Sequence, residues 1–170
     1  AVAEKLEFAE TILRRRCLIF YIAGALTEAS EEDKDRYIKT AELCETRGML
    51  GYAPHLYGTD PKKYPDLTPE EIRNIDFLFG AVLPNMHINF LFPIAHGNAI
   101  EQGWAEVFHI PSIYLAPRMM RLSRLTRGML NIYATILYDD MDGAYNELGI
   151  CLNGLIPIIK KVGEEVVLDI

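Results

Sequence analysis

The chain has 170 residues, half of them hydrophobic, and carries a formal net charge of −7 at pH 7. This length suits one domain with a real hydrophobic core, and the composition excludes a mainly disordered chain. The acidic balance argues against a nucleic-acid polymer as partner, because binding to a phosphate backbone needs clustered cations. The basic clusters 14–16 and 118–127 are expected to cap or solvate helices, although a few local donors can bind one phosphate of a small ligand.

The sequence indicates a cytoplasmic protein with no membrane partner. No apolar run reaches the roughly 18 residues that a membrane span needs, and the stretch 1–16 lacks the apolar centre of a signal peptide. Cys17, Cys44 and Cys151 are widely spaced and form no CxxC pattern. We interpret them as small buried hydrophobic residues. No two histidines share metal-ligand spacing with a carboxylate, so neither a metal nor another cofactor is expected.

The N-terminal part of the chain predicts a helix, a strand, a helix and a strand in turn. Residues 3–16 place apolar side chains at helical spacing and predict a leading helix. The apolar run 17–23 predicts a strand buried on both faces. Residues 30–47 begin with Ser-Glu-Glu-Asp and end at Arg-Gly, which are good helix start and stop signals. A second short strand is expected over 49–54.

A long polar loop is predicted over 55–69, with one glycine and three prolines. Structureless loops of this length are more often functional than idle. The sequence Thr-Pro-Glu-Glu at 68–71 supplies an N-cap, a proline at the first helical position and a carboxylate at the third. It therefore predicts a helix that runs to about Phe79.

The remaining chain continues the alternation of strands and helices. Strands are predicted over 87–92, 112–115 and 131–138, and helices over 99–108, 118–130 and 141–155. This pattern predicts one α/β domain over 1–170, in which 118–170 supplies the C-terminal helices and the last strand. The expected architecture is a three-layer flavodoxin- or Rossmann-like sandwich with a central five-stranded parallel sheet.

In such a sheet, ligands bind at the carboxyl ends of the strands, near the point where the strand order reverses. Three segments should meet there: the turn 23–27, the loop 55–66 and the turn 92–101. The first turn contains Gly24 and Ala25, whose small size lets a ligand approach the backbone. It lacks the GxGxxG fingerprint of dinucleotide-binding proteins, and tight packing explains the small residues equally well.

Glu101 is the candidate for chemistry in the turn after the third strand. Gly97 marks the point where the turn becomes a helix, and Glu101 is expected within about the first turn of that helix. The helix dipole and free backbone donors there favour an ionised carboxylate, which could act as a nucleophile. An ordinary glutamate at a helix start is the alternative interpretation.

The turn 21–24 (Tyr-Ile-Ala-Gly), the helix that carries Asp76, and the segment 97–105 occur in an order and at separations that resemble a known family. This is the nucleoside 2-deoxyribosyltransferase family, with its relatives the nucleoside 5′-monophosphate N-glycosidases. The resemblance covers roughly residues 17–117. Its most specific part is the pattern Gly-x-x-x-Glu-x-Gly-x-Ala, followed shortly by Ile-Pro-Ser-Ile-Tyr-Leu at 110–115.

The resemblance implies cleavage or transfer of the N-glycosidic bond of a (deoxy)nucleoside or a nucleoside 5′-monophosphate, through a covalent glycosyl-glutamate intermediate. It assigns Glu101 as the nucleophile, Tyr21 as the residue that positions it, and Asp76 as the group that assists departure of the base or holds the sugar. The Asp or Ser that the family usually has six residues before the nucleophile is Ala95 here. A homo-oligomer, a dimer or larger, is also implied.

Other residues are candidates for binding the nucleoside or nucleotide. His55 and Tyr57 would stack on the base, or else anchor their loop. His96 would donate to a hydroxyl or phosphate, or else cap the next helix. Asn98 would offer its amide to the sugar, or merely suit a helix start. The complete predicted binding set is Gly24, Ala25, His55, Tyr57, His96, Gly97 and Asn98.

A non-catalytic module that senses a nucleoside or nucleotide on the same fold is the competing hypothesis. Ala95, which replaces a polar residue, favours the sensor. Retention of Glu101, Tyr21 and Asp76 favours the enzyme.

Overall fold

The structure is a computed structural model that describes residues 2–15, 17–27 and 29–167. The strands are β1 (Ile19–Ala23), β2 (Leu50–Tyr52), β3 (Met86–Phe90), β4 (Ser112–Pro117) and β5 (Ile132–Tyr138). The helices are α1 (Val2–Arg15), α2 (Glu31–Glu45), α3 (Pro54–Tyr57), α4 (Pro69–Phe77), the π-helical η1 (Leu78–Val82), α5 (His96–Val107), α6 (Arg124–Arg127) and α7 (Met141–Val167).

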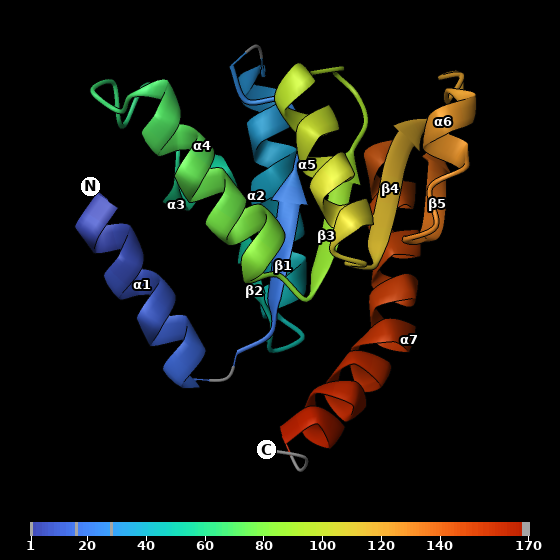
Figure 1. Cartoon of the computed structure of the whole chain (residues 1–170). Helices are drawn as coiled ribbons and strands as arrows, with labels where there is room; N and C mark the ends of the chain where they lie inside the picture. Colours follow the sequence, from blue (N-terminus) through green and yellow to red (C-terminus); the bar gives the residue numbers. More distant parts are fainter. Residues whose placement is uncertain (1, 16, 28, 168–170) are drawn as a thin grey trace.

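All five strands are parallel and form one sheet in the order β2-β1-β3-β4-β5, with helices on both faces (Figure 1). The predicted α/β class and central five-stranded parallel sheet are therefore confirmed. The first crossover leads from β1 to β2, and the next returns past β1 to β3. The strand order thus reverses between β1 and β3, and their carboxyl ends form the switch point at which ligands bind in this class of sheet.

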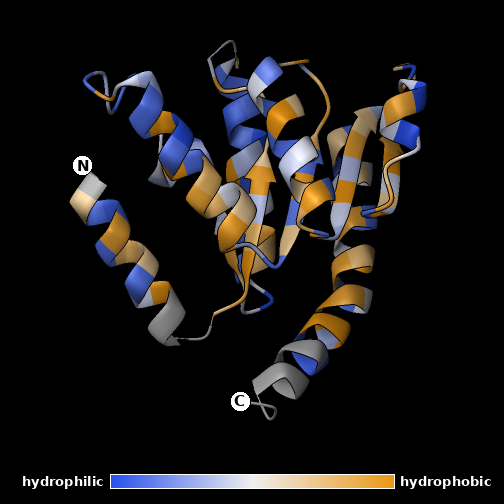
Figure 2. Ribbon diagram, viewed as in Figure 1, coloured by the Kyte–Doolittle hydropathy of each residue, from blue (hydrophilic) through white to orange (hydrophobic). Residues whose placement is uncertain are grey.

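Each face of the sheet has its own apolar layer. On one face, α2 and α7 pack on the strands through buried residues such as Tyr37 and Leu148. On the other face, α1 and α4 pack near β1 through Ala9 and Ile75. Figure 2 shows mainly apolar strands flanked by helices in which polar and apolar residues are mixed. Burial of these alternating faces is the main force that holds the three layers together.

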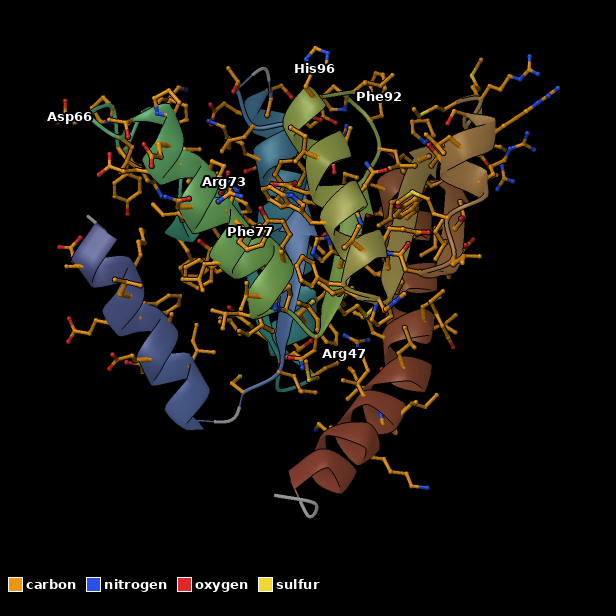
Figure 3. All side chains as sticks on the ribbon, viewed as in Figure 1. Arg47, Asp66, Arg73, Phe77, Phe92 and His96 are labelled. Carbon is orange, nitrogen blue, oxygen red and sulfur yellow. The ribbon has the colours of Figure 1, made fainter. Side chains whose placement is uncertain are left out.

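The face with α4 and α5 carries the polar residues of interest. In β1 and β3, alternate residues Phe20 and Ile88 belong to the opposite apolar layer. Tyr21 and His87 therefore face α4 and α5, and they are partners in the sheet register. The two helices also pack against each other: the rings of Phe77 (labelled in Figure 3) and Trp104 meet edge to face at 5.2 Å.

Two predicted helices have wrong boundaries with clear physical reasons. In the segment 118–130 only α6 is helical, because Ser123 accepts a hydrogen bond from the backbone N–H of Thr126 and starts the helix in mid-segment. The predicted last helix, 141–155, continues to Val167 although Pro157 lies inside it. Leu155 and Ile156 are buried in the core at this point, and their packing compensates for the lost backbone hydrogen bond.

Smaller boundary errors affect three other elements. The strand predicted over 49–54 has only three residues, and α3 begins the segment predicted to be a loop. The helix predicted over 99–108 begins three residues earlier. The leading helix agrees with the prediction up to Arg15, since Arg16 lies outside the described residues, as do 168–170. Within the described ranges, no helix is both long and apolar enough to cross a bilayer.

Candidate active site

A cleft of about 510 Å³ opens at the carboxyl edge of β1 and β3. The three segments that were predicted to meet at this edge all contribute to its lining, together with α4. The lining residues are Gly24, Leu26, Thr27, Pro54, Thr59, Pro61, Ile72, Asp76, Ile94, Ala95, His96, Gly97, Asn98 and Glu101.

Glu101 lines this cleft, and the fully buried Tyr21 contacts it from beneath the lining. Asn98, Glu101 and Ala105 form the buried stripe of α5, so the Glu101 side chain faces the sheet and not the solvent. The Tyr21 hydroxyl donates a hydrogen bond to Glu101 Oε1 at 2.6 Å. A Cβ on Gly80 would lie 3.2 Å from the Tyr21 ring, so the absence of a side chain at Gly80 gives that ring its room. The pair is thus held by two separate elements, β1 and α5.

The expectation that Glu101 is kept ionised by a helix start is wrong. The pKa of Glu101 is raised to about 8, and burial is the largest cause. The nearby charge of Asp76 also raises this pKa, whereas the Tyr21 hydrogen bond lowers it by less. Because α5 begins at His96, Glu101 lies in its second turn, beyond the free N–H groups of the first. The raised pKa favours the protonated form of Glu101 in the free protein.

Asp76 is the second carboxyl group of the cleft and projects from α4. The Thr59 hydroxyl donates to Asp76 Oδ1 at 3.1 Å. Burial raises the pKa of Asp76 to about 6, and the Thr59 hydrogen bond opposes this shift. Sequence reasoning did not single out Thr59; its only signal was its place in the polar loop after β2. The two carboxyl groups thus have pKa values displaced by different amounts, which is typical of acid–base pairs.

Gly24 lines the cleft, and packing against Tyr37 explains why this position holds a glycine. A Cβ at this position would come within 2.5 Å of the Tyr37 ring. Ala25 is buried behind the cleft, and its carbonyl accepts a hydrogen bond from the Tyr37 hydroxyl at 2.9 Å. Tyr37 of α2 therefore fixes the turn after β1.

His55 and Tyr57 lie away from the cleft: in the described part of the chain, neither side chain belongs to the lining. His55 is buried, with its ring 5.7 Å from that of Tyr37. Tyr57 stacks on Phe8 of α1 at 5.6 Å. Both residues have the loop-anchoring arrangement that was the alternative to base stacking, because a one-turn helix starting at Pro54 turns them toward the core.

The leading end of α5 forms one wall of the cleft through His96, Gly97 and Asn98. Figure 3 shows His96 at the tip of this helix, where its ring is exposed. Asn98 donates from Nδ2 to the carbonyl of Phe90 at 2.7 Å and so ties the helix to the end of β3. Among the described residues, no side chain caps α5, since the N-cap residue is Ala95. Its first N–H groups are therefore available to an anion.

Among the described residues, no group of three His, Cys, Asp or Glu side chains is arranged to hold a metal ion. The titratable groups that line the cleft are Asp76, His96 and Glu101. The arrangement can therefore supply acid–base and nucleophilic chemistry from two carboxyl groups.

The sheet order and the cleft at the switch point define a flavodoxin-like α/β fold. No family model and no curated protein matches the chain. Among solved structures, CMP N-glycosidase BcmB from Clostridium botulinum aligns with a TM-score of 0.62 at 20% identity, over 79% of this chain and 99% of that chain. BlsM aligns with a TM-score of 0.66 at 17% identity, over 85% and 94%. At these identities the similarity establishes a shared fold, as the family resemblance implied.

Proposed function

We propose that this protein cleaves the N-glycosidic bond of a nucleoside 5′-monophosphate, with Glu101 as the nucleophile. The observation that carries this conclusion is the 2.6 Å hydrogen bond from Tyr21 to Glu101 in a cleft that also contains Asp76. Most enzymes that cleave glycosidic bonds use two carboxyl groups that flank the scissile bond. The shared fold with a CMP N-glycosidase supports a nucleotide as the substrate class.

The raised pKa values suggest that the carboxyl pair works with one proton between them. Transfer of that proton from Glu101 to Asp76 leaves a carboxylate nucleophile and an acid in the same cleft. Glu101 attacks the anomeric carbon as its bond to the base nitrogen breaks, and Asp76 protonates the departing base. Tyr21 donates to the Glu101 carboxylate and holds its orientation.

The sugar–Glu101 ester is then resolved by an acceptor. With water, the oxygen bonds to the anomeric carbon, the ester bond breaks to release the Glu101 carboxylate, and Asp76 takes the proton. With a second base the same step would be a transfer. The one-proton state of the pair is restored in either case.

The open end of α5 supports a phosphate on the substrate. Free backbone N–H groups and the positive end of the helix dipole favour an anion beside 96–98. Gly97 has no side chain that would block the approach, and a Cβ there would meet open space in the described structure. We place the 5′-phosphate at this end of the cleft, with His96 as an additional donor.

The proposal is tested by base release. The wild-type protein is incubated with ribo- and deoxyribonucleosides and their 5′-monophosphates, and free base is quantified by liquid chromatography. We expect release from a monophosphate, and a loss of about a thousandfold or more in Glu101→Gln. The matched control is Glu106→Gln on the same helix, whose carboxylate accepts from the backbone N–H of Leu130 outside the cleft. Full activity in Glu101→Gln would refute the assignment.

A nucleotide sensor is the second candidate. Burial raises the pKa of Glu101 and so favours its neutral form in the free protein, and the Ala95 side chain brings no polar group to the cleft. Both features suit binding without turnover. Calorimetric binding of a nucleoside 5′-monophosphate with no base release over many hours would favour the sensor over the enzyme.

We also propose that the protein forms a homo-oligomer. Several large apolar side chains on α5 and around α6 are exposed, and such gatherings commonly mark interfaces. They include Ile100, Val107, Phe108, Leu125 and Leu130. Light scattering at several concentrations tests this directly, and a monomer throughout would contradict it.

A further inference from the structure

Tyr52 is a second buried tyrosine beside the carboxyl pair. It ends β2 and is the register partner of Tyr21 in β1. The two rings stack with centroids 5.8 Å apart, and Phe79 stacks on Tyr52 at 4.3 Å with nearly parallel planes. The Tyr52 ring is thus held between two aromatic neighbours.

The Tyr52 hydroxyl lies next to Gly58, in the loop that also supplies the Asp76 partner Thr59. A Cβ built on Gly58 would come within 2.6 Å of this oxygen. Gly58 directly precedes Thr59, whose hydroxyl donates to Asp76 Oδ1. After burial, the charge of Asp76 is the largest influence that raises the pKa of Tyr52, which agrees with their proximity.

The same hydroxyl is buried and has no hydrogen-bond partner within the described parts of the chain. A buried hydroxyl without a partner costs about 1–3 kcal/mol. The aromatic stack alone would be equally well made by phenylalanine, which has no such cost. A polar atom in this position therefore calls for an explanation outside packing.

We propose, building on the function above, that Tyr52 is a positioning residue for Asp76, and that its hydroxyl holds this carboxyl group together with Thr59 during the reaction. A phenol can donate to a carboxylate and accept from a carboxylic acid, so it serves Asp76 before and after the proton moves. Two neighbouring strands thus supply one tyrosine to each carboxyl group: Tyr21 for Glu101 and Tyr52 for Asp76.

Several groups face Asp76 from the surrounding elements. Glu101 on α5 and Tyr21 on β1 already bond to each other, and Thr59 already donates to Asp76. His96 lies at the exposed tip of α5. Tyr52 also belongs to these surroundings. Within the described structure its hydroxyl is buried and, unlike those of Tyr21 and Thr59, has no hydrogen-bond partner.

The test is Tyr52→Phe, which keeps the stack and removes the oxygen. We expect kcat for base release to fall about tenfold or more, with KM changed less than about twofold, because Asp76 is misoriented while the binding walls remain. Tyr138→Phe is the matched control, since the Tyr138 hydroxyl is also buried without a partner among the described residues but lies on β5, away from the cleft. It should retain wild-type kinetics.

Two further readouts separate this role from structure and from the proposed function. Thermal unfolding should show Tyr52→Phe at least as stable as wild type, which excludes misfolding as the cause. Carbon-detected NMR titration of Asp76 should show a higher pKa in Tyr52→Phe than in wild type, and no change in Tyr138→Phe. An unchanged Asp76 pKa, or wild-type kcat in Tyr52→Phe, overturns the role of Tyr52. Failure of the proposed function alone would appear instead as no base release by the wild type, with the Asp76 shift still present.

Discussion

Two carboxyl groups of the cleft, the buried Glu101 and the half-buried Asp76, set the pH at which the proposed reaction can proceed. The pKa of Asp76 is raised to about 6 and that of Glu101 to about 8. If the working form carries one proton on the pair, activity is lost below the lower pKa, where both are protonated, and above the upper pKa, where both are ionised. We expect a bell-shaped profile of kcat/KM with its maximum near pH 7. A rate that keeps rising well above the upper limb would contradict a shared proton.

Removal of the Tyr21 hydroxyl tests how this residue positions Glu101. In Tyr21→Phe, Glu101 loses its 2.6 Å donor, and with it a hydrogen bond that lowers its pKa. We expect kcat/KM to fall about 10- to 100-fold, and the upper limb of the pH profile to move to higher pH. Steady-state kinetics across pH provide the measurement. Tyr114→Phe is the control, because that hydroxyl bonds to the Met129 sulfur outside the cleft. Equal losses in both variants would indicate a general structural effect.

The sequence predicted the positions of Glu101, Tyr21 and Asp76 in the candidate site better than it predicted the protonation of Glu101. Tyr21 lies on β1, Asp76 on α4 and Glu101 on α5, and the packing of these helices on the parallel sheet brings the three residues together. The charge of Glu101 depends on how deeply α5 is seated, which no local pattern reveals. His55 and Tyr57 were misplaced because a loop's side-chain directions depend on its turns, here the short α3.

At the scale of elements, the seating of α2 against β2 depends on a glycine. A Cβ on Gly51 would lie 2.4 Å from the Ala41 Cα, which is backbone and cannot move aside. We expect Gly51→Ala to lower the free energy of unfolding by about 1–3 kcal/mol, measured by urea denaturation. Gly103→Ala on α5 is the control, where the added Cβ meets open space and should add up to about 1 kcal/mol through helix propensity. Equal stability of both variants would contradict the tight contact.

The elements themselves were predictable where local chemistry decided them. Ser30 and Thr68 form complete capping boxes with Asp33 and Glu71, and both helices begin where their sequences indicated. The segment 118–130 was misread because its arginines suit a helix, whereas the chain there has to connect β4 to β5. Arg118 instead pairs with Asp139 at the far end of β5.

At the scale of the whole molecule, the buried glutamate links stability to pH. The pKa of Glu101 is about 8 in the folded protein against an ordinary value of 4.5, so the folded state binds more protons between these values. Stability from this group is complete below about pH 4.5 and declines as pH rises toward 8. We expect the free energy of unfolding of Glu101→Gln relative to wild type to increase by up to about 4 kcal/mol between about pH 5 and about pH 8.5. Denaturant titrations that show a constant difference would contradict the burial of a protonated Glu101.

The overall architecture followed from the alternation of strands and helices, because parallel strands need crossover helices and those helices need both faces of the sheet. Strand order could not be predicted in the same way, since the strands are all mainly apolar and this pattern does not specify which strands are neighbours. The order β2-β1-β3-β4-β5 is what makes Tyr21 the neighbour of both Tyr52 and His87. The composition of the site is therefore a product of topology as much as of sequence.

The proposed reaction passes through a covalent bond between Glu101 and the sugar. Its most direct test is to incubate the protein with a nucleoside 5′-monophosphate that carries fluorine at the 2′ position, which slows breakdown of the ester, and to measure the intact mass and the modified peptide. We expect a mass increase equal to the fluorinated sugar phosphate, located on Glu101 and lacking in Glu101→Gln. Release of base with the adduct on another residue, or with the same adduct in Glu101→Gln, would contradict it.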